Sequence, residues 1–325
     1  MAIEKILKQL TPARKKKEIE AIKNIELPKE LQQWVKKYKK VGERGDLIWL
    51  LTWKIIKTVS LSDISTNYQE SLQNVKFMIT MFVILSDDIV DKNKNQRLLN
   101  ELFGIAMDGH YEKSENLAFG EKKYIKFIEE IWGYIVNSIE KYPRYKEFKE
   151  IFYYDIFQIL NSMNFALLVN KYHFLINKTE YWAYFPCSMQ AMIYTDLHLM
   201  CDTKLKAEEF GMIREVIWKA QNMTRIGNWL STWKREIEEK DYTSGVFAYA
   251  IDSGVLTIEE LEQEPKAKII NRINNSKIEK ELLNKWDKEY REIEKFDKKI
   301  KLINIKKFLS ELESLMILHL SLKGL

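Results

Sequence analysis

Hydrophobic residues recur at helical spacing along most of the chain, and no stretch shows a credible strand alternation. Leu47–Val59 and Asn304–Leu320 each collect apolar side chains on one face, and residues 277–296 do the same in a more charged segment. Tyr145–Leu168 has the pattern of one long, aromatic-rich helix. These patterns predict an all-α fold, with roughly ten or more helices packed as one bundle in a single domain over residues 1–325.

One predicted helix ends in a cluster of acids. The ten uncharged residues Phe77–Ser86 run directly into Asp87, Asp88 and Asp91, in the sequence DDIVD. Burying a carboxylate without compensation is costly, so these side chains should lie where the helix meets water or a cation. Asp87 and Asp91 are four residues apart and share a helix face, and carboxylate oxygens are ligands that Mg²⁺ prefers. The cluster predicts a magnesium site, although acidic helix ends are also common without one.

A second polar stripe follows much later in the chain. Asn228, Thr232 and Glu236 are spaced four residues apart, so they lie along one face of a helix. Their amide, hydroxyl and carboxylate oxygens suit a further Mg²⁺ site. The alternative is an exposed stripe of ordinary ion pairs. Trp229 and Trp233 flank the stripe, which favours the wall of a pocket.

A helical pattern over residues 179–201 is interrupted at Pro186. Proline inside a helix removes one hydrogen bond and bends the chain. We therefore expect a broken helix here, and a break in an apolar bundle can line a site.

Composition narrows the classes of function. The chain has 52 Lys and Arg against 47 Asp and Glu, mixed along its length, so we expect no nucleic-acid partner. Cys187 and Cys201 lack metal-ligand spacing and fit a reducing compartment. No segment approaches the roughly 20 apolar residues of a membrane span, and no signal-peptide pattern is present. We expect a cytoplasmic protein with no transmembrane segment, in which residues 1–25 form a peripheral segment.

The DDIVD motif at 87–91 together with NWLSTWKRE at 228–236 resembles the two metal motifs of microbial class I terpene synthases. The resemblance implies the class I terpenoid synthase fold and a lyase that ionises a linear isoprenyl diphosphate and cyclises the carbocation to a terpene hydrocarbon or alcohol. It implies three Mg²⁺ ions as cofactors. The implied catalytic and metal-binding residues are Asp87, Asp88, Asp91, Asn228, Thr232 and Glu236.

The family usually places a diphosphate-sensing arginine near the helix break, but no Arg or Lys lies between Lys178 and Lys204. The best remaining cations for the diphosphate are Arg225, Lys234 and Arg235. The chain has 9 Trp, 16 Tyr and 15 Phe, which suggests an aromatic-lined cavity, while core packing is the default for any single ring. Candidates for the cavity wall are Phe82, Tyr154, Phe157, Trp182, Tyr184, Phe185, Tyr194 and Trp229.

Four points stay open. Small side chains near the break favour a deep pocket and thus geranylgeranyl diphosphate as substrate. A prenyltransferase or a squalene/phytoene-type condensing enzyme is an alternative, but it needs a second aspartate-rich motif where this chain has Asn, Thr and Glu. A non-catalytic helical scaffold is the alternative outside enzymes. A homodimer also stays open.

Overall fold

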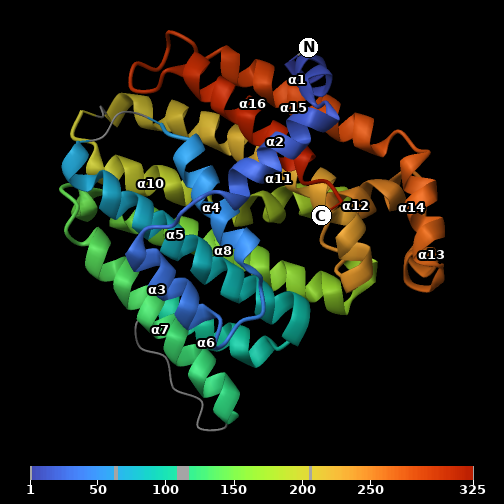
Figure 1. Ribbon diagram of the computed structural model, residues 1–325, viewed down its shortest axis with the longest axis horizontal. Helices are drawn as coiled ribbons and strands as arrows, with labels where there is room; N and C mark the ends of the chain where they lie inside the picture. The colour runs from blue at the N-terminus through green and yellow to red at the C-terminus, as the bar shows by residue number, and fades with distance from the viewer. Residues whose placement is uncertain (1, 62–64, 108–116, 205–206, 325) are drawn as a thin grey trace.

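Every regular element that the structure describes is a helix. The computed structural model describes residues 2–61, 65–107, 117–204 and 207–324, and it contains no strand in those ranges. Helices pack around one another in a single bundle (Figure 1). The all-α prediction is confirmed.

The helices are named here in chain order. The first eight α-helices and the π-helix that follows α5 are α1 (Ala2–Gln9), α2 (Pro12–Lys23), α3 (Lys29–Tyr38), α4 (Asp46–Thr58), α5 (Thr66–Asp88), η1 (Ile89–Asn93), α6 (Gln96–Met107), α7 (Phe119–Ile139) and α8 (Tyr145–Lys171). The rest are η2 (His173–Leu175), α9 (Lys178–Tyr184), η3 (Phe185–Met189), α10 (Ala191–Cys201), η4 (Ala207–Glu209), α11 (Phe210–Glu239), α12 (Gly245–Asp252), α13 (Ile258–Gln263), α14 (Lys266–Asn274), α15 (Ile278–Glu294) and α16 (Ile305–Ser321).

The helices predicted from hydrophobic spacing are present as α4, α8, α15 and α16, each within a few residues of its expected ends. The break at Pro186 is also present. Helix α9 ends at Tyr184, a 3₁₀ turn (η3) carries the proline, and α10 begins at Ala191. Gln190 joins the two with φ of 65°, a left-handed conformation that a continuous helix does not contain.

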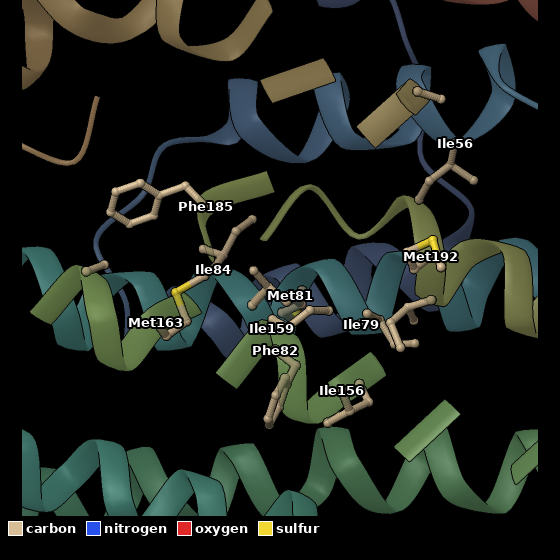
Figure 2. Packing of buried hydrophobic residues seen from close by; sticks show 14 of the residues in the cluster. Ile56, Ile79, Met81, Phe82, Ile84, Ile156, Ile159, Met163, Phe185 and Met192 are labelled. Carbon is tan, nitrogen blue, oxygen red and sulfur yellow. The ribbon is translucent and has the colours of Figure 1, made fainter. Parts of the chain in front are cut away.

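The core lies between α5, α8, α10 and α11. In Figure 2, Ile79 and Phe82 of α5 lie near Ile156 and Ile159 of α8. The uncharged run of α5 is buried at every position except Thr80, which is half-buried, as its lack of charge predicts. Helix α5 therefore places its acidic end at the edge of the core.

The amino-terminal helices lie beside the carboxyl-terminal ones (Figure 1). Ile3 and Ile6 of α1 are buried, and the Ile3 amide donates a 3.2 Å hydrogen bond to Asp287 Oδ1 of α15. Helix α2 packs against α4 and α16. None of the described helices combines the length and the apolar character needed to cross a membrane.

One buried charge within α5 is not part of the acidic cluster. Lys76 is only 6% exposed, and within the described ranges no hydrogen-bond acceptor or carboxylate pairs with its ammonium. The ammonium lies 5.3 Å from the centroid of the Tyr194 ring. Burial lowers the pKa of Lys76 to about 8.

We expect Lys76→Met to raise the free energy of unfolding at pH 7 by roughly 3 kcal/mol, because about 2.5 pKa units separate the folded and unfolded amine. Below pH 8 both states bind the proton and the full penalty is present. Between pH 8 and about 10.5 the folded amine is neutral and the unfolded amine loses its proton progressively. The penalty therefore shrinks across this range and is gone above it. Urea unfolding at pH 7 and pH 10 measures the difference in free energy of unfolding between Lys76→Met and the wild type. Lys16→Met, at an exposed lysine, is the control. A difference that does not shrink with rising pH would contradict this account.

Candidate active site

The two polar motifs meet at one cavity of about 190 Å³ between α5, η1, α8, η3 and α11. Asp87 and Asp91 line it from the end of α5 and from η1. Asn228 and Glu236 line it from α11. Because the motifs are far apart in the sequence, only the packing of α5 and α11 in the same bundle brings them to one place.

The three aspartates of the first motif occupy different environments. The Asp87 side chain is 42% exposed toward the cavity, whereas that of Asp88 is 5% exposed. Asp88 points to a neighbouring hollow, and its Oδ2 accepts a 2.6 Å hydrogen bond from the Tyr38 hydroxyl. Asp91 lies in the π-helical turn, a form often found at functional sites. The motif thus offers two carboxylates to the cavity and holds the third in the protein.

An arginine that the sequence motifs do not point to contacts all three aspartates. Arg44, from the connection between α3 and α4, donates from Nε to Asp88 Oδ1 at 2.7 Å. Its Nη2 donates to Asp87 Oδ2 at 2.9 Å and to Asp91 Oδ2 at 3.4 Å. Burial alone would lower the pKa of Arg44, but the three carboxylates outweigh it and raise that pKa.

The second motif carries unused hydrogen-bonding capacity. Asn228 Oδ1 accepts a 2.9 Å hydrogen bond from Arg225 Nη1, and Thr232 Oγ1 donates to the Asn228 carbonyl at 2.9 Å. Glu236 is buried, and its Oε2 has no hydrogen-bond partner in the described structure. The buried Arg225 Nε likewise has none there. Since buried polar groups are normally paired, these atoms point to a ligand.

A further carboxylate at the cavity is not predicted by the sequence motifs. Asp241 follows the end of α11 and is held by Asn170 Nδ2 at 3.1 Å and by the Thr243 amide at 3.1 Å. It lines the cavity with Asp91 and Glu236. Its only sequence signal is its position five residues after Glu236.

Crowding and burial disfavour negative charge on these acids. Burial, followed by the charges of Asp87 and Asp241, raises the pKa of Asp91 well above its usual value. Burial and the charge of Asp241 raise the pKa of Glu236 to about 8. Burial is also the largest cause of the raised pKa of Asp87. A cation in the cavity would restore the charged forms.

The donor set fits Mg²⁺. Carboxylate and amide oxygens face one another across the cavity, and the guanidinium of Arg44 already lies as a cation among the aspartates. Among the described residues no three acidic, thiol or imidazole side chains converge on one point. That arrangement agrees with magnesium chemistry, in which one or two protein carboxylates and the phosphates of a substrate share the ion.

This architecture is similar to that of solved structures. No family model matches the sequence, and no curated protein matches it. Among solved structures, 2-methylisoborneol synthase from Streptomyces coelicolor A3(2), in complex with Mg²⁺ and geranyl-S-thiolodiphosphate, is similar over 97% of this chain and 92% of that chain, with a TM-score of 0.53 and 12% identity. The same synthase with Mg²⁺ and 2-fluoroneryl diphosphate is similar over the same shares, with a TM-score of 0.50 and 12% identity. The chain has the class I terpene synthase fold.

Within this terpene synthase fold, the three predicted diphosphate cations differ in position. Arg225 is buried in the cavity wall, 5.2 Å from the centroid of the Phe185 ring. Arg235 lies at the rim and pairs with Glu239 at 3.4 Å. Lys234 lies over the Trp233 ring and is not part of the lining. Arg225 is thus the innermost of the three.

The aromatic wall predicted from the sequence is mostly absent at this cavity, where Phe185 is the one predicted ring in the lining. Tyr154 and Phe157 are wrong as cavity residues, because they are 57% and 50% exposed on the outer face of α8. The inner face of that helix presents Met163 and Ala166 instead. The other candidate rings pack elsewhere in the fold: Phe82 on Trp132, Trp182 on Trp229, Tyr184 on Phe165, and Tyr194 beside a second hollow.

The helix break supplies one side of the cavity of the terpene synthase fold. Ser188, Met189 and Gln190 line it from the turn after Pro186. Gln190 Oε1 accepts a 3.0 Å hydrogen bond from Thr80 Oγ1, which ties the break to α5. The rest of the lining combines apolar side chains with polar ones: Ile48, Val83, Ile84, Met163, Ala166, Ser162 and Thr243.

Proposed function

We propose that this protein is a magnesium-dependent terpene cyclase acting on a linear isoprenyl diphosphate. The observation that carries the proposal is the meeting of Asp87 and Asp91 with Asn228 and Glu236 at one cavity that also contains a buried guanidinium, Arg225. The structural neighbours hold Mg²⁺ together with a thiolodiphosphate or a diphosphate, which supports the same chemistry for this chain.

In this proposal the first motif, with Asp87 and Asp91 as the accessible carboxylates, would hold two Mg²⁺ ions, and Asn228, Thr232 and Glu236 would hold a third. When bound, magnesium stabilises the charge that develops on the departing diphosphate. Asp88 has a supporting part, since Tyr38 and Arg44 already engage both of its oxygens.

Arg225 would donate hydrogen bonds to the diphosphate from a position fixed by Asn228. Charge-assisted hydrogen bonds of guanidinium to phosphate oxygens are strong and directional. In the reaction, the allylic C–O bond breaks and its electron pair leaves with the diphosphate. The carbocation then closes a ring through a carbon–carbon double bond. It ends by losing a proton to give a hydrocarbon, or by adding water and losing a proton to give an alcohol.

The walls of the cavity would protect the carbocation. Val83, Ile84 and Met163 offer no nucleophilic oxygen or nitrogen, and the face of Phe185 can attract positive charge. Excluding water matters because water ends the reaction early. The cavity thus carries apolar side chains beside its two polar motifs, together with the hydroxyls of Ser162, Ser188 and Thr243.

The preference for geranylgeranyl diphosphate stays a prediction, as do a homodimer and a cytoplasmic location. The cavity volume of about 190 Å³ lies below the roughly 300–1,000 Å³ of typical ligand pockets. A C20 chain would therefore need the cavity to widen or to join the hollow beside Tyr194, with which it shares Met189.

Product analysis by gas chromatography–mass spectrometry tests the proposal. Purified protein with Mg²⁺ is incubated separately with the C10, C15, C20 and C25 diphosphates. We expect a cyclic hydrocarbon or alcohol from one of them and none after chelation. A longer diphosphate formed only when isopentenyl diphosphate is added would instead establish a prenyltransferase. No product and no binding of pyrophosphate would favour a non-catalytic scaffold.

A further inference from the structure

The connection between α3 and α4 is built to hold one arginine against the aspartate motif. The Tyr38 hydroxyl accepts a 3.2 Å hydrogen bond from the Arg44 amide while it donates to Asp88. Gly42 packs directly on the Tyr38 ring, where a Cβ would lie 2.2 Å from Cζ. The backbone around Arg44 is therefore fixed by contacts that leave no room for a larger residue at Gly42.

The two ends of the Arg44 guanidinium have different partners. Nε bonds at 2.7 Å to Asp88, which is buried and is also bonded by Tyr38. Nη2 bonds to Asp87 and, more loosely at 3.4 Å, to Asp91, the two carboxylates that line the cavity. The Nε end thus bonds a carboxylate that is enclosed by protein. The Nη2 end bonds two carboxylates that a metal ion in the cavity could also bind.

We propose that Arg44 is an exchangeable cation of this site: it neutralises Asp87 and Asp91 until Mg²⁺ binds them, and its Nη2 then turns to the diphosphate while Nε stays on Asp88. This proposal rests on the proposed function. The segment of the helix break contributes no cation of its own: Lys178, at the start of α9, pairs with Asp252 and lies over the Tyr249 ring, and Arg225 approaches the break from α11. Arg44 supplies a guanidinium to the cavity from another direction.

Electrostatics favour this exchange of partners. With Mg²⁺ on Asp87 and Asp91, a guanidinium beside them would face positive charge, whereas the diphosphate offers several anionic oxygens. Guanidinium forms paired hydrogen bonds with phosphate oxygens readily, so the terminal nitrogens gain partners at the moment they lose the aspartates. Metal and Arg44 therefore compete when Mg²⁺ is added alone and cooperate when diphosphate is present.

Isothermal titration calorimetry on the full chain separates these two effects. The titrants are Mg²⁺ alone, and inorganic pyrophosphate at saturating Mg²⁺. For Arg44→Met we expect Mg²⁺ alone to bind about tenfold tighter and pyrophosphate to bind at least about tenfold weaker. Arg44→Lys keeps the charge but cannot bond Asp88 and the cavity together, so it should weaken pyrophosphate binding too. Arg14→Met, which removes an exposed partner of Glu18, should change neither.

The proposal is tested by the opposite directions in which Arg44→Met should change Mg²⁺ affinity and pyrophosphate affinity. If Arg44→Met weakens both titrations, the arginine only holds the motif in shape, and the proposal is wrong. If both tighten, or neither changes, Arg44 does not reach the diphosphate, and the proposal is again wrong. Asp88→Ala covers the case in which Arg44→Met fails to fold, because it removes the acceptor of Arg44 Nε and should weaken pyrophosphate binding. A wild-type chain that binds no pyrophosphate with Mg²⁺ would overturn the proposed function itself.

Discussion

Asp87→Ala is expected to lower kcat/KM for the isoprenyl diphosphate by about a thousandfold or more, equivalent to about 4 kcal/mol of transition-state stabilisation. Asp87 is the most accessible carboxylate of its motif and faces the cavity. Its loss would remove a Mg²⁺ ligand and leave charge on the departing diphosphate without compensation. Steady-state release of pyrophosphate measures the effect, and calorimetry with Mg²⁺ and pyrophosphate should show the same loss of binding.

The folded state should tolerate this substitution. Burial raises the pKa of Asp87, and its side chain is 42% exposed at the cavity, so we expect alanine to change the melting temperature little. Asp88→Asn is the matched comparison within the motif and should cost less activity, because Asp88 faces Tyr38. An Asp87→Ala variant that binds pyrophosphate and turns over normally would show that the site is assigned to the wrong residues.

Arg225→Met is expected to weaken Mg²⁺-dependent pyrophosphate binding by about 30-fold or more, about 2 kcal/mol or above. The Arg225 guanidinium is buried beside Asn228, and its Nε has no hydrogen-bond partner in the described structure. Removing it would also leave Glu236 with less compensating charge, since Arg225 lowers the pKa of that acid. Competition of pyrophosphate with substrate gives the affinity.

Two variants make this result specific. Arg225→Lys keeps a positive charge and should recover part of the affinity, because lysine cannot match the planar fork of arginine. Lys234→Met removes a neighbouring charge that lies over Trp233 outside the cavity and should have little effect. Equal losses in all three variants would mean that general positive charge, and no particular contact of Arg225, determines binding.

The sequence predicts those parts of the structure that depend on local spacing. The phase of α5 and α11 follows from apolar residues at helical spacing, and that phase places Asp87 with Asp91, and Asn228 with Glu236, on common faces. The break at Pro186 follows from the geometry of proline, which has no amide hydrogen to donate within a helix. Each of these is set within a few turns of one segment.

Features that depend on long-range packing could not be predicted in this way. Tyr154 and Phe157 have the same helical spacing as the buried residues of α8, and only the neighbouring helices decide which face of α8 points inward. Arg44 lies more than forty residues before Asp87, and Asp241 lies beyond the end of α11, so neither belongs to a local pattern with the motifs. Their place at the cavity comes from how whole segments dock.

A crystal structure with Mn²⁺ and inorganic pyrophosphate would test the central claim most directly, because Mn²⁺ prefers the same oxygen ligands as Mg²⁺ and can be located by anomalous scattering. The account predicts metal ions about 2 Å from oxygens of Asp87 and Asp91 and others at Glu236 and Asn228, all sharing one pyrophosphate. Pyrophosphate bound in the hollow beside Lys40 and Tyr124, or metal at only one of the two motifs, would contradict it.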